Sequence, residues 1–411
     1  MTERWVRIAR DTVPEAPTTM AARILAIYHR AETFGGSFNS VKDVLSRADA
    51  SRFRIACGVP GPGNVADMFR ALGLPVHWCA DRPSAKTPGY AWTVASTIRL
   101  LLREHIDLVY VTDHVSWRSS GLFAARLAGR ATVVHLRSPR EDVAHDPELL
   151  AATMVVANSE ATARALRPHR PPERLRVVPN FIDFEAFETA RDIRRAFFPS
   201  GPPVVGFVGV FRPEKGIEYF LDMARQVHER RPEVRFLAVG GESSVEDIGW
   251  FDRMRAYAES LGLAAVVHFT GARTDIADLM ASMDVVAVPS LNEGFGRVIV
   301  EANAVGRLVV GADAAGIPEV VQPGVSGLLV PPRDAPALAD AVMRILDAAD
   351  WRLRAGRELP AATRQRYSPE VQMTRLQQAW DDALSYRNDP TPGRRAANRT
   401  LPAGAPRARR G

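Results

Sequence analysis

Several features that would define a class of protein are scarce or missing in this sequence. It has two cysteines, Cys57 and Cys79, which are too few for a disulfide framework and lack the spacing of a metal-ligand pair. No apolar run reaches the roughly 20 residues that a membrane-spanning helix needs. Residues 1–20 mix Glu, Asp and Arg without an apolar core, so we expect a flexible leader and not a signal peptide. These absences predict a cytoplasmic protein.

Closely spaced carboxylates are also missing. A hard divalent cation takes oxygen ligands, and an enzyme that binds one at a strand end needs carboxylates close together there. The sequence contains no Asp-x-Asp. We therefore expect no metal site.

The excess positive charge is confined to the C-terminus. The formal net charge is +6, and the segment from Arg387 onward has seven arginines and one aspartate, so the rest of the chain is neutral. Residues 387–411 are rich in Pro, Gly and Arg with almost nothing to bury, which predicts a disordered, solvated basic tail. The alternative is a weak peripheral contact with an anionic membrane surface. No aromatic residues alternate with the arginines, so we expect no nucleic-acid partner.

What the sequence does contain is an alternation of β-branched runs with amphipathic stretches, the pattern of a parallel sheet wrapped by helices. A chain of 411 residues, 46% of them apolar, is too long for one ordinary core. The first series of expected strands lies at residues 23–29, 52–58, 75–79, 107–112, 132–136, 154–158 and 176–180. The second lies at residues 204–210, 235–241, 266–271, 284–290, 308–313 and 326–332.

The two series predict two doubly wound, Rossmann-like α/β domains that face each other across a cleft. We place the domains at residues 21–180 and 181–364, and expect a helix at 365–386 to cross back over the pair. Ligands of such sheets bind beyond the carboxyl ends of the strands. The functional site should therefore lie in the cleft.

The segment EGFGRVIVE, residues 293–301, carries the most informative pattern. Gly294 and Gly296 follow a strand end, where backbone N–H groups can approach an anion at a helix start. Glu301 lies two turns into that helix, where a second part of the same ligand can reach. Carboxylates accept hydrogen bonds from vicinal hydroxyls, so a ligand with a central diphosphate and a polyol at each end, such as a nucleotide sugar, fits. An ordinary acidic helix start explains Glu293 but not Glu301.

A second pair of residues points to the same edge of the sheet. Arg212 and Lys215 follow the expected strand at 204–210 directly. Two cations at a strand-to-helix turn can hold a diphosphate by charge-assisted hydrogen bonds. Alone such a turn is usually just solvated, but beside EGFG it favours a diphosphate site.

The second half of the sequence closely resembles the retaining glycosyltransferases of family 4, which have the GT-B fold. The resemblance rests on three stretches in this order: FVGVFRPEKGIEYFLDMA, FTGARTDIADLMASMDVVAVPSLNEGFGRVIVEANAVGRLVV and AGIPEVVQPGVSGLLVPPRD. The resemblance covers about 160 residues of the second half. It is looser in the first half, at a Gly-Gly turn and at VVANSEATARAL and VVPNFID.

The resemblance implies a nucleotide-sugar donor, a UDP- or GDP-hexose, as co-substrate with no cofactor. It assigns Glu301 to the ribose hydroxyls and Glu293 to the hydroxyls of the transferred sugar. Arg212 and Lys215 would stabilise the departing diphosphate, and Arg273 would lie near the base. The acceptor, bound by the N-terminal domain, would be a glycan, a lipid-linked sugar or a small molecule.

The resemblance also assigns backbone contacts to the donor. Phe295 and Gly296 would offer amides to the sugar and the phosphate, next to Gly294. Gly35 and Gly36 would close on the diphosphate from the opposite domain.

The sequence departs from the family pattern in two places. Phe181 replaces a glycine that usually follows the asparagine of the linker motif, which can alter the hinge. At the end of a strand where the family often has a histidine, this chain has His135 inside the strand and Arg137 at its end, both on one face. We expect Arg137 to be the better-placed group for the cleft, and which of the two touches the sugar stays open here.

Parts of the sequence also fit two other classes of protein. Residues 61–66, GPGNVA, match a dinucleotide fingerprint, and Asp81 follows the next strand like a ribose-binding acid. This alternative is an NAD(P)-dependent oxidoreductase, but Pro60 and Pro62 remove amides from the turn that would hold the pyrophosphate. A non-catalytic nucleotide-sugar binder or an epimerase is the third class, and the two cations at the leaving group favour catalysis over it.

Overall fold

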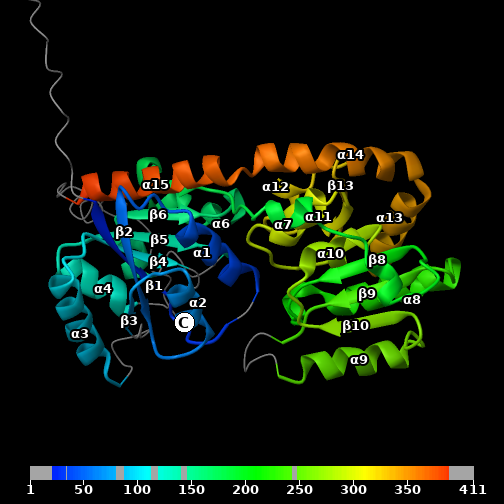
Figure 1. Cartoon of the computed structure of the whole chain (residues 1–411), viewed down its shortest axis with the longest axis horizontal. Helices are drawn as coiled ribbons and strands as arrows, with labels where there is room; N and C mark the ends of the chain where they lie inside the picture. The colour runs from blue at the N-terminus through cyan, green and yellow to red at the C-terminus, as the bar shows by residue number, and fades with distance from the viewer. Residues whose placement is uncertain are drawn as a thin grey trace, which may run out of the picture.

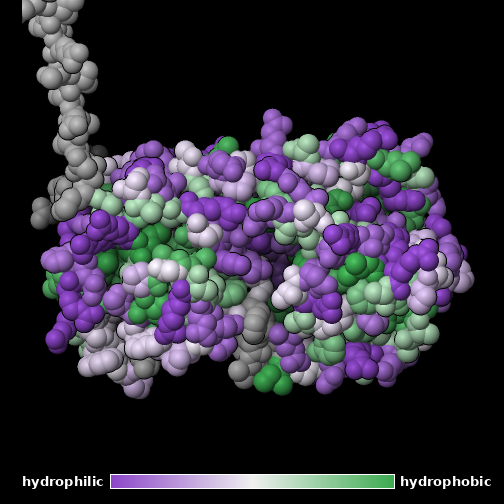
Figure 2. Space-filling model, viewed as in Figure 1, coloured by the Kyte–Doolittle hydropathy of each residue, from purple (hydrophilic) through white to green (hydrophobic). Residues whose placement is uncertain are grey.

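The computed structural model describes residues 21–33, 35–79, 88–112, 119–139, 146–242 and 248–387. It shows two α/β halves side by side, and a helical segment runs along one side of both (Figure 1). Hydrophilic side chains gather on the surface where the halves meet (Figure 2). In the described residues, no helix combines the length and the apolarity that crossing a membrane requires.

The first half is built on a seven-stranded parallel sheet in the order β3-β2-β1-β4-β5-β6-β7. Its strands read as continuous apolar runs because both faces of the sheet are covered. Alternate residues of one strand enter different cores, as Ile24 and Ala26 pack on one face while Leu25 and Ile27 pack on the other. The strands are β1 Ala22–Ile27, β2 Phe53–Val59, β3 Val76–Trp78, β4 Leu108–Thr112, β5 Ala131–Leu136, β6 Met154–Ala157 and β7 Leu175–Val177.

Two layers of helices cover this sheet. Helices α1 (Gly36–Ser46) and α2 (Asn64–Ala71) share a core with one face. Helices α3 (Tyr90–Arg103), α4 (Ser120–Leu127) and α6 (Glu160–Arg164) cover the other face, with α5 (Pro147–Ala151) beside α4.

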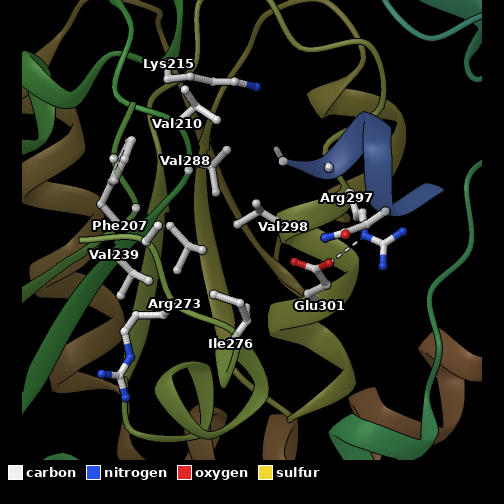
Figure 3. Close-up of a pocket in the computed structure, with 18 of the residues that line it drawn as sticks. Phe207, Val210, Lys215, Val239, Arg273, Ile276, Val288, Arg297, Val298 and Glu301 are labelled. Carbon is white, nitrogen blue, oxygen red and sulfur yellow. Dashed lines mark hydrogen bonds and ion pairs between the residues drawn. The ribbon is translucent and has the colours of Figure 1, made fainter. Parts of the chain in front are cut away.

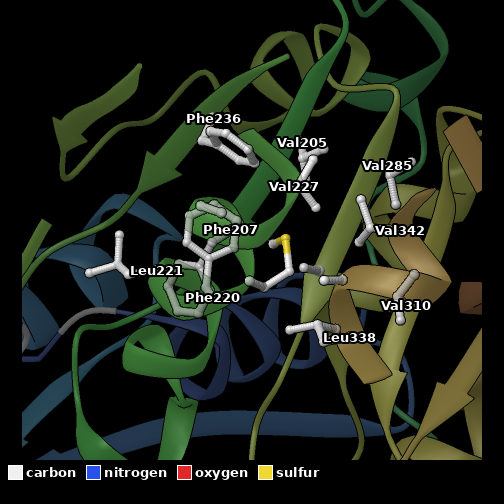
Figure 4. Packing of buried hydrophobic residues seen from close by; sticks show 14 of the residues in the cluster. Val205, Phe207, Phe220, Leu221, Val227, Phe236, Val285, Val310, Leu338 and Val342 are labelled. Carbon is white, nitrogen blue, oxygen red and sulfur yellow. The ribbon is translucent and has the colours of Figure 1, made fainter. Parts of the chain in front are cut away.

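The second half repeats the plan on a six-stranded parallel sheet in the order β10-β9-β8-β11-β12-β13. Its strands are β8 Val204–Val208, β9 Arg235–Val239, β10 Val267–Gly271, β11 Val285–Val288, β12 Leu308–Ala312 and β13 Gly327–Val330. One core joins the sheet to helices α8 (Ile217–Arg230), α9 (Trp250–Ser260) and α13 (Ala335–Asp347). There Phe220 packs against Phe207 and Phe236 with ring centroids 5.6 and 6.3 Å apart (Figure 4). The other face carries α10 (Ile276–Ala281), α11 (Arg297–Ala304) and α12 (Ile317–Val320).

The last two helices join the halves. Helix α14 (Ala349–Arg366) packs on α11, and α15 (Pro369–Tyr386) crosses back to β4, β5 and β6 of the first sheet (Figure 1). Trp380 of α15 is fully buried, with its ring edge-on to Phe53 and Tyr110 at 5.1 and 5.3 Å. The expected start of this helix at residue 365 is wrong, because α14 ends at Arg366 and α15 begins at Pro369. Ser368 caps α15 by accepting a hydrogen bond from the Val371 amide.

The predicted fold class is confirmed, and every expected strand is present with ends shifted by a few residues. The first sheet lies within residues 21–180 and the second within 181–364, while the domain limits themselves stay predictions. Helix α7 (Glu185–Glu188) lies in the connection between the sheets. The predicted leader 1–20 and tail residues 388–411 lie outside the described part of the chain.

Arg387 was assigned to the tail, but it contacts the folded chain. Its Nε donates to the Gly129 carbonyl oxygen at 2.8 Å, and its guanidinium lies 3.6 Å from the Asp107 carboxylate. The packed part of the chain therefore extends at least through Arg387.

Candidate active site

Among the cavities where the halves face each other, two adjoin and border Glu293. One of about 530 Å³ is lined mainly by the second half, and one of about 450 Å³ by both halves. The residues that line both cavities are Gly35, Gly36, Val210, Lys215, Glu293 and Arg297. Strands β8 and β11 are neighbours in the sheet, so the turns that follow them meet at this place. A ligand can therefore span both cavities.

The turn after β11 presses against the first half. A Cβ on Gly294 would collide with the carbonyl oxygen of Arg137 in the opposite half, so only glycine fits there. Gly296 has φ +88°, a left-handed conformation that also favours glycine, and it starts helix α11. The Phe295 side chain is buried edge-on against Tyr367, with ring centroids 5.4 Å apart, and anchors the turn from below. The proposed backbone contacts of these residues to a donor stay predictions.

The cations after β8 reach the same turn. Lys215 Nζ lies 2.5 Å from Glu293 Oε2, and the Arg212 guanidinium lies 3.6 Å from the Glu214 carboxylate. The two turns are tied together because the Leu291 amide donates to the Glu214 carbonyl oxygen at 2.8 Å. The structure thus brings together Arg212, Lys215 and Glu293, although Arg212 lines only the smaller cavity.

Glu301 faces the larger cavity from helix α11 and is paired with Arg297, which is not among the predicted site residues. Arg297, one turn earlier, donates from Nε to Glu301 Oε1 at 2.7 Å (Figure 3). Burial raises the pKa of Glu301, and Arg297 acts in the opposite direction. Burial alone would lower the pKa of Arg297, but Glu301 and Asp43 raise it above its ordinary value. The i, i+4 spacing of Arg and Glu after EGFG could have revealed this pair.

Arg273 lies at the far end of the larger cavity from Lys215 (Figure 3). Its Nε and Nη2 donate to the two carboxylate oxygens of Asp275 at 2.8 and 2.6 Å. The Asp275 carboxylate raises the pKa of Arg273, whose side chain is 40% exposed. The guanidinium is thus committed to Asp275, and the predicted nearness of Arg273 to a base rests on its place in the cavity lining.

The first half contributes the start of helix α1. Gly35 precedes the helix with φ +107°, and a Cβ there would come within 3.4 Å of the Val210 side chain. A Cβ on Gly36 would lie 3.7 Å from Arg297 Cδ. The Gly-Gly turn therefore lies against the second half at both cavities, opposite the EGFG turn.

Arg137 and His135 differ in what they can reach. Arg137 lines the smaller cavity, and its Nη1 donates to Asn180 Oδ1 at 2.9 Å. His135 is buried beneath it, with Nδ1 2.7 Å from the Tyr110 hydroxyl. Burial, reinforced by the nearby Arg137 charge, lowers the pKa of His135 well below its ordinary value. A neutral, packed His135 leaves Arg137 as the group of the two that borders the cleft.

Amides of the GPGNVA turn, residues 61–66, donate hydrogen bonds to other groups of the protein. A Cβ on Gly63 would collide with the Ala31 carbonyl oxygen, and the Val65 amide donates to that same oxygen at 3.2 Å. The Asn64 amide donates to the Glu32 carboxylate at 3.2 Å. The amides that would hold a pyrophosphate are therefore committed to the loop after β1, which disfavours the oxidoreductase alternative. Asp81, its expected ribose ligand, lies outside the described residues.

Within the described part of the chain, no group of three or more His, Cys, Asp or Glu side chains is placed to hold a metal ion.

Two parallel α/β sheets facing across a cleft, with the turns at their strand ends lining it, define the GT-B fold. Solved structures agree: HepE of Anabaena in complex with UDP and glucose superposes with a TM-score of 0.76 at 24% identity, covering 88% of this chain and 99% of that one. The complex of HepE with UDP gives 0.74 at 25% identity, covering 88% of this chain and 100% of that one.

Sequence relatives make the identification more specific. Residues 34–186 match Glycosyltransferase Family 4, and residues 202–348 match Glycosyl transferases group 1. The D-inositol 3-phosphate glycosyltransferase of Mycolicibacterium smegmatis is 32% identical over 74% of this chain and 72% of its own length. The enzyme of that name from Mycobacterium ulcerans is 31% identical over 86% and 79%, whereas the match to the Corynebacterium glutamicum enzyme, at 30% identity, spans 59% of that protein. The chain belongs to glycosyltransferase family 4, and it is a glycosyltransferase.

Proposed function

We propose that this enzyme transfers a hexose-type sugar from a UDP- or GDP-sugar to an acceptor hydroxyl, with retention at the anomeric carbon and without a metal ion. The observation that carries the proposal is the position of the Lys215–Glu293 ion pair at the junction of the two cavities. A sugar held at that junction has the diphosphate cations on one side and the first half of the molecule on the other.

In this proposal the donor spans both cavities, with its nucleoside in the larger one and its diphosphate at the junction, where the EGFG turn and Arg212 border the smaller one. Glu301 accepts from the ribose hydroxyls, and Arg297 orients its carboxylate by holding one oxygen (Figure 3). Glu293 accepts from hydroxyls of the transferred sugar, and the amides of the EGFG turn face the diphosphate. The HepE complexes with UDP and with UDP-glucose support a uridine donor.

Catalysis comes from orientation and from stabilising charge on the leaving group. The acceptor oxygen forms the new bond to the anomeric carbon, on the face from which the phosphate leaves. The bond from that carbon to the β-phosphate oxygen breaks with its electron pair on the phosphate, and the acceptor proton moves to that oxygen. Arg212 and Lys215 stabilise the charge that builds there. In metal-dependent transferases a divalent cation has this role.

The acceptor occupies the part of the smaller cavity that the diphosphate leaves open. Arg30 and Arg137 line this cavity together with hydroxyl and amide side chains. Arginine side chains bind phosphate groups by paired hydrogen bonds, which favours a polar acceptor that carries an anionic group. The names of the D-inositol 3-phosphate glycosyltransferases support an acceptor of this chemistry.

A donor panel tests the proposal. The enzyme is incubated with UDP-, GDP- and ADP-sugars and with sugar-phosphate and neutral polyol acceptors, and release of the nucleoside diphosphate is measured. We expect release with a UDP- or GDP-sugar that an acceptor accelerates, and a product with the anomeric configuration of the donor by NMR. An inverted product would contradict retention, and no release with any donor would contradict the proposed activity.

A further inference from the structure

Arg297 makes contacts with both halves of the molecule at once. On its own helix it holds Glu301, and across the cleft its Nη1 donates to Asp43 Oδ2 of α1 at 2.6 Å. The same Nη1 lies 3.4 Å from the Ser40 hydroxyl and 3.4 Å from the carbonyl oxygen of Phe181 in the linker. One guanidinium therefore connects the second half, the first half and the segment between them.

This connection is buried, so its contribution to stability depends on its geometry. The side chains of Arg297, Asp43 and Glu301 are 12%, 10% and 10% exposed. A buried charge that loses its partner is costly, whereas exposed pairs contribute little. The planar fork of arginine can serve two carboxylates in fixed directions, which a single ammonium group cannot do.

The bridge also fixes the place of helix α1 relative to the donor cavity. The Arg297 stem lies beside Gly36 at the start of α1, and its guanidinium reaches Asp43 two turns further along. Gly35 and Gly36 line both cavities. A shift of α1 along or away from Arg297 would therefore move the Gly-Gly turn away from a bound diphosphate.

The linker is held to the same helix. Phe181, where the family usually has glycine, is buried in the core of the first half, and Arg47, the residue directly after α1, pairs with Asp183 at 3.2 Å. The Arg47–Asp183 pair is largely exposed and contributes little, so the buried Arg297 carries the contact between the linker and α1.

We propose that Arg297 is a positioning residue that couples the two halves: through Asp43 it sets helix α1 and its Gly-Gly turn against the donor cavity, and through Glu301 it sets the carboxylate on the donor side. The proposal rests on the proposed function for its effect on turnover. Asp43 and Arg297 act on the register of the two halves, and neither exchanges a proton or a bond with the substrates.

The test compares Asp43→Asn with Asp183→Asn in the full chain. Both changes neutralise an acid near Arg47, but only Asp43 touches Arg297. We expect Asp43→Asn to lower donor turnover roughly 10-fold or more, because misplacement of reacting groups is costly. Affinity for free UDP or GDP should not change, since Arg297 still holds Glu301. Hydrogen exchange of the α1 amides should be faster in Asp43→Asn than in wild type, and Asp183→Asn should match wild type in all three measurements.

Arg297→Lys is the second variant and keeps the positive charge without the fork. We expect it to lose turnover as Asp43→Asn does, and full turnover in this variant would overturn the coupling. Equal turnover in Asp43→Asn and Asp183→Asn would also overturn the coupling. A fall in turnover matched by an equal fall in UDP and GDP affinity would overturn it as well, because such a result indicates general loss of structure. If wild type hydrolyses or transfers no donor, the proposed function fails, while the α1 exchange rates of the two variants still decide whether the bridge holds the helix.

Discussion

At the scale of single residues, Glu301 and Glu293 of the cleft are each held by a cation. Arg297 holds Oε1 of Glu301, and the other oxygen points toward the larger cavity (Figure 3). Lys215 holds Glu293 in the same manner at the junction of the cavities. Such pairing keeps each carboxylate oriented, so that it can accept hydrogen bonds from sugar hydroxyls.

Glu301→Gln should weaken binding of the nucleoside diphosphate by about 1–3 kcal/mol while the protein stays folded, because one acceptor for two ribose hydroxyls is lost. Calorimetry with UDP and GDP measures this change. Because burial raises the pKa of Glu301, the wild-type carboxyl takes up its proton at a higher pH than an exposed glutamate does. Wild-type affinity should therefore fall on acidification through that raised pKa, and the variant should lack this step. Unchanged affinity in Glu301→Gln would contradict the ribose assignment.

Arg212→Ala and Lys215→Ala should each slow turnover by roughly two or more orders of magnitude and weaken donor binding far less, if these cations act chiefly in the transition state. Steady-state kcat and donor KM separate the two effects. Arg225→Ala is the matched control, since Arg225 pairs with Glu229 on the exposed side of α8. A rise in KM with normal kcat in the cleft variants would instead assign these residues to ground-state binding.

At the scale of elements, the strands could be predicted because their signal is local. Continuous apolar runs mark strands that are buried on both faces, and the turns after them place Arg212, Lys215 and Glu293 at one edge. The contacts of Arg297 could not be predicted in the same way, because Asp43 lies 254 positions away and no periodicity links the two. The boundary between α14 and α15 was also not predicted, although Ser368 followed by Pro369 is a helix-start signal.

Helix α15 should contribute strongly to stability through a single side chain. Trp380→Ala removes a fully buried ring between Phe53 and Tyr110, and the free energy of unfolding should fall by about 3–5 kcal/mol. Chemical denaturation measures the loss. Val371→Ala on the same helix is the control, because Val371 is 45% exposed and should cost little. Equal stability of the two variants would show that α15 does not anchor the first half.

At the scale of the whole molecule, the two halves touch at several separate places. Besides the Arg297 bridge, the Glu319 carboxylate of α12 accepts from the amides of Glu160 and Ala161 at the start of α6, at 2.8 and 2.6 Å. The Gly294 turn lies on the Arg137 backbone. The cleft is therefore bounded by contacts on both sides of the site, and helices α14 and α15 together join the halves from outside.

Removal of residues 388–411 should leave the melting temperature and donor turnover unchanged, because this segment carries charge but almost no residues that could enter a core. The truncation keeps Arg387, whose side chain contacts Gly129 and Asp107. Thermal melting and diphosphate release check the outcome. A truncated protein that fails to fold would show that the tail packs, and loss of activity only with membrane-embedded acceptors would show that the tail is an electrostatic anchor.

In the proposed mechanism, Arg212, Lys215 and the helix-start amides near Gly296 stabilise the departing diphosphate without a metal ion. Release of the nucleoside diphosphate, with the best donor and acceptor, in the presence of EDTA tests this directly. We expect the rate in the chelator to equal the rate without it, and added Mg²⁺ or Mn²⁺ to bring no further gain. Complete loss of activity in EDTA, restored by Mg²⁺ or Mn²⁺, would contradict catalysis without a metal ion.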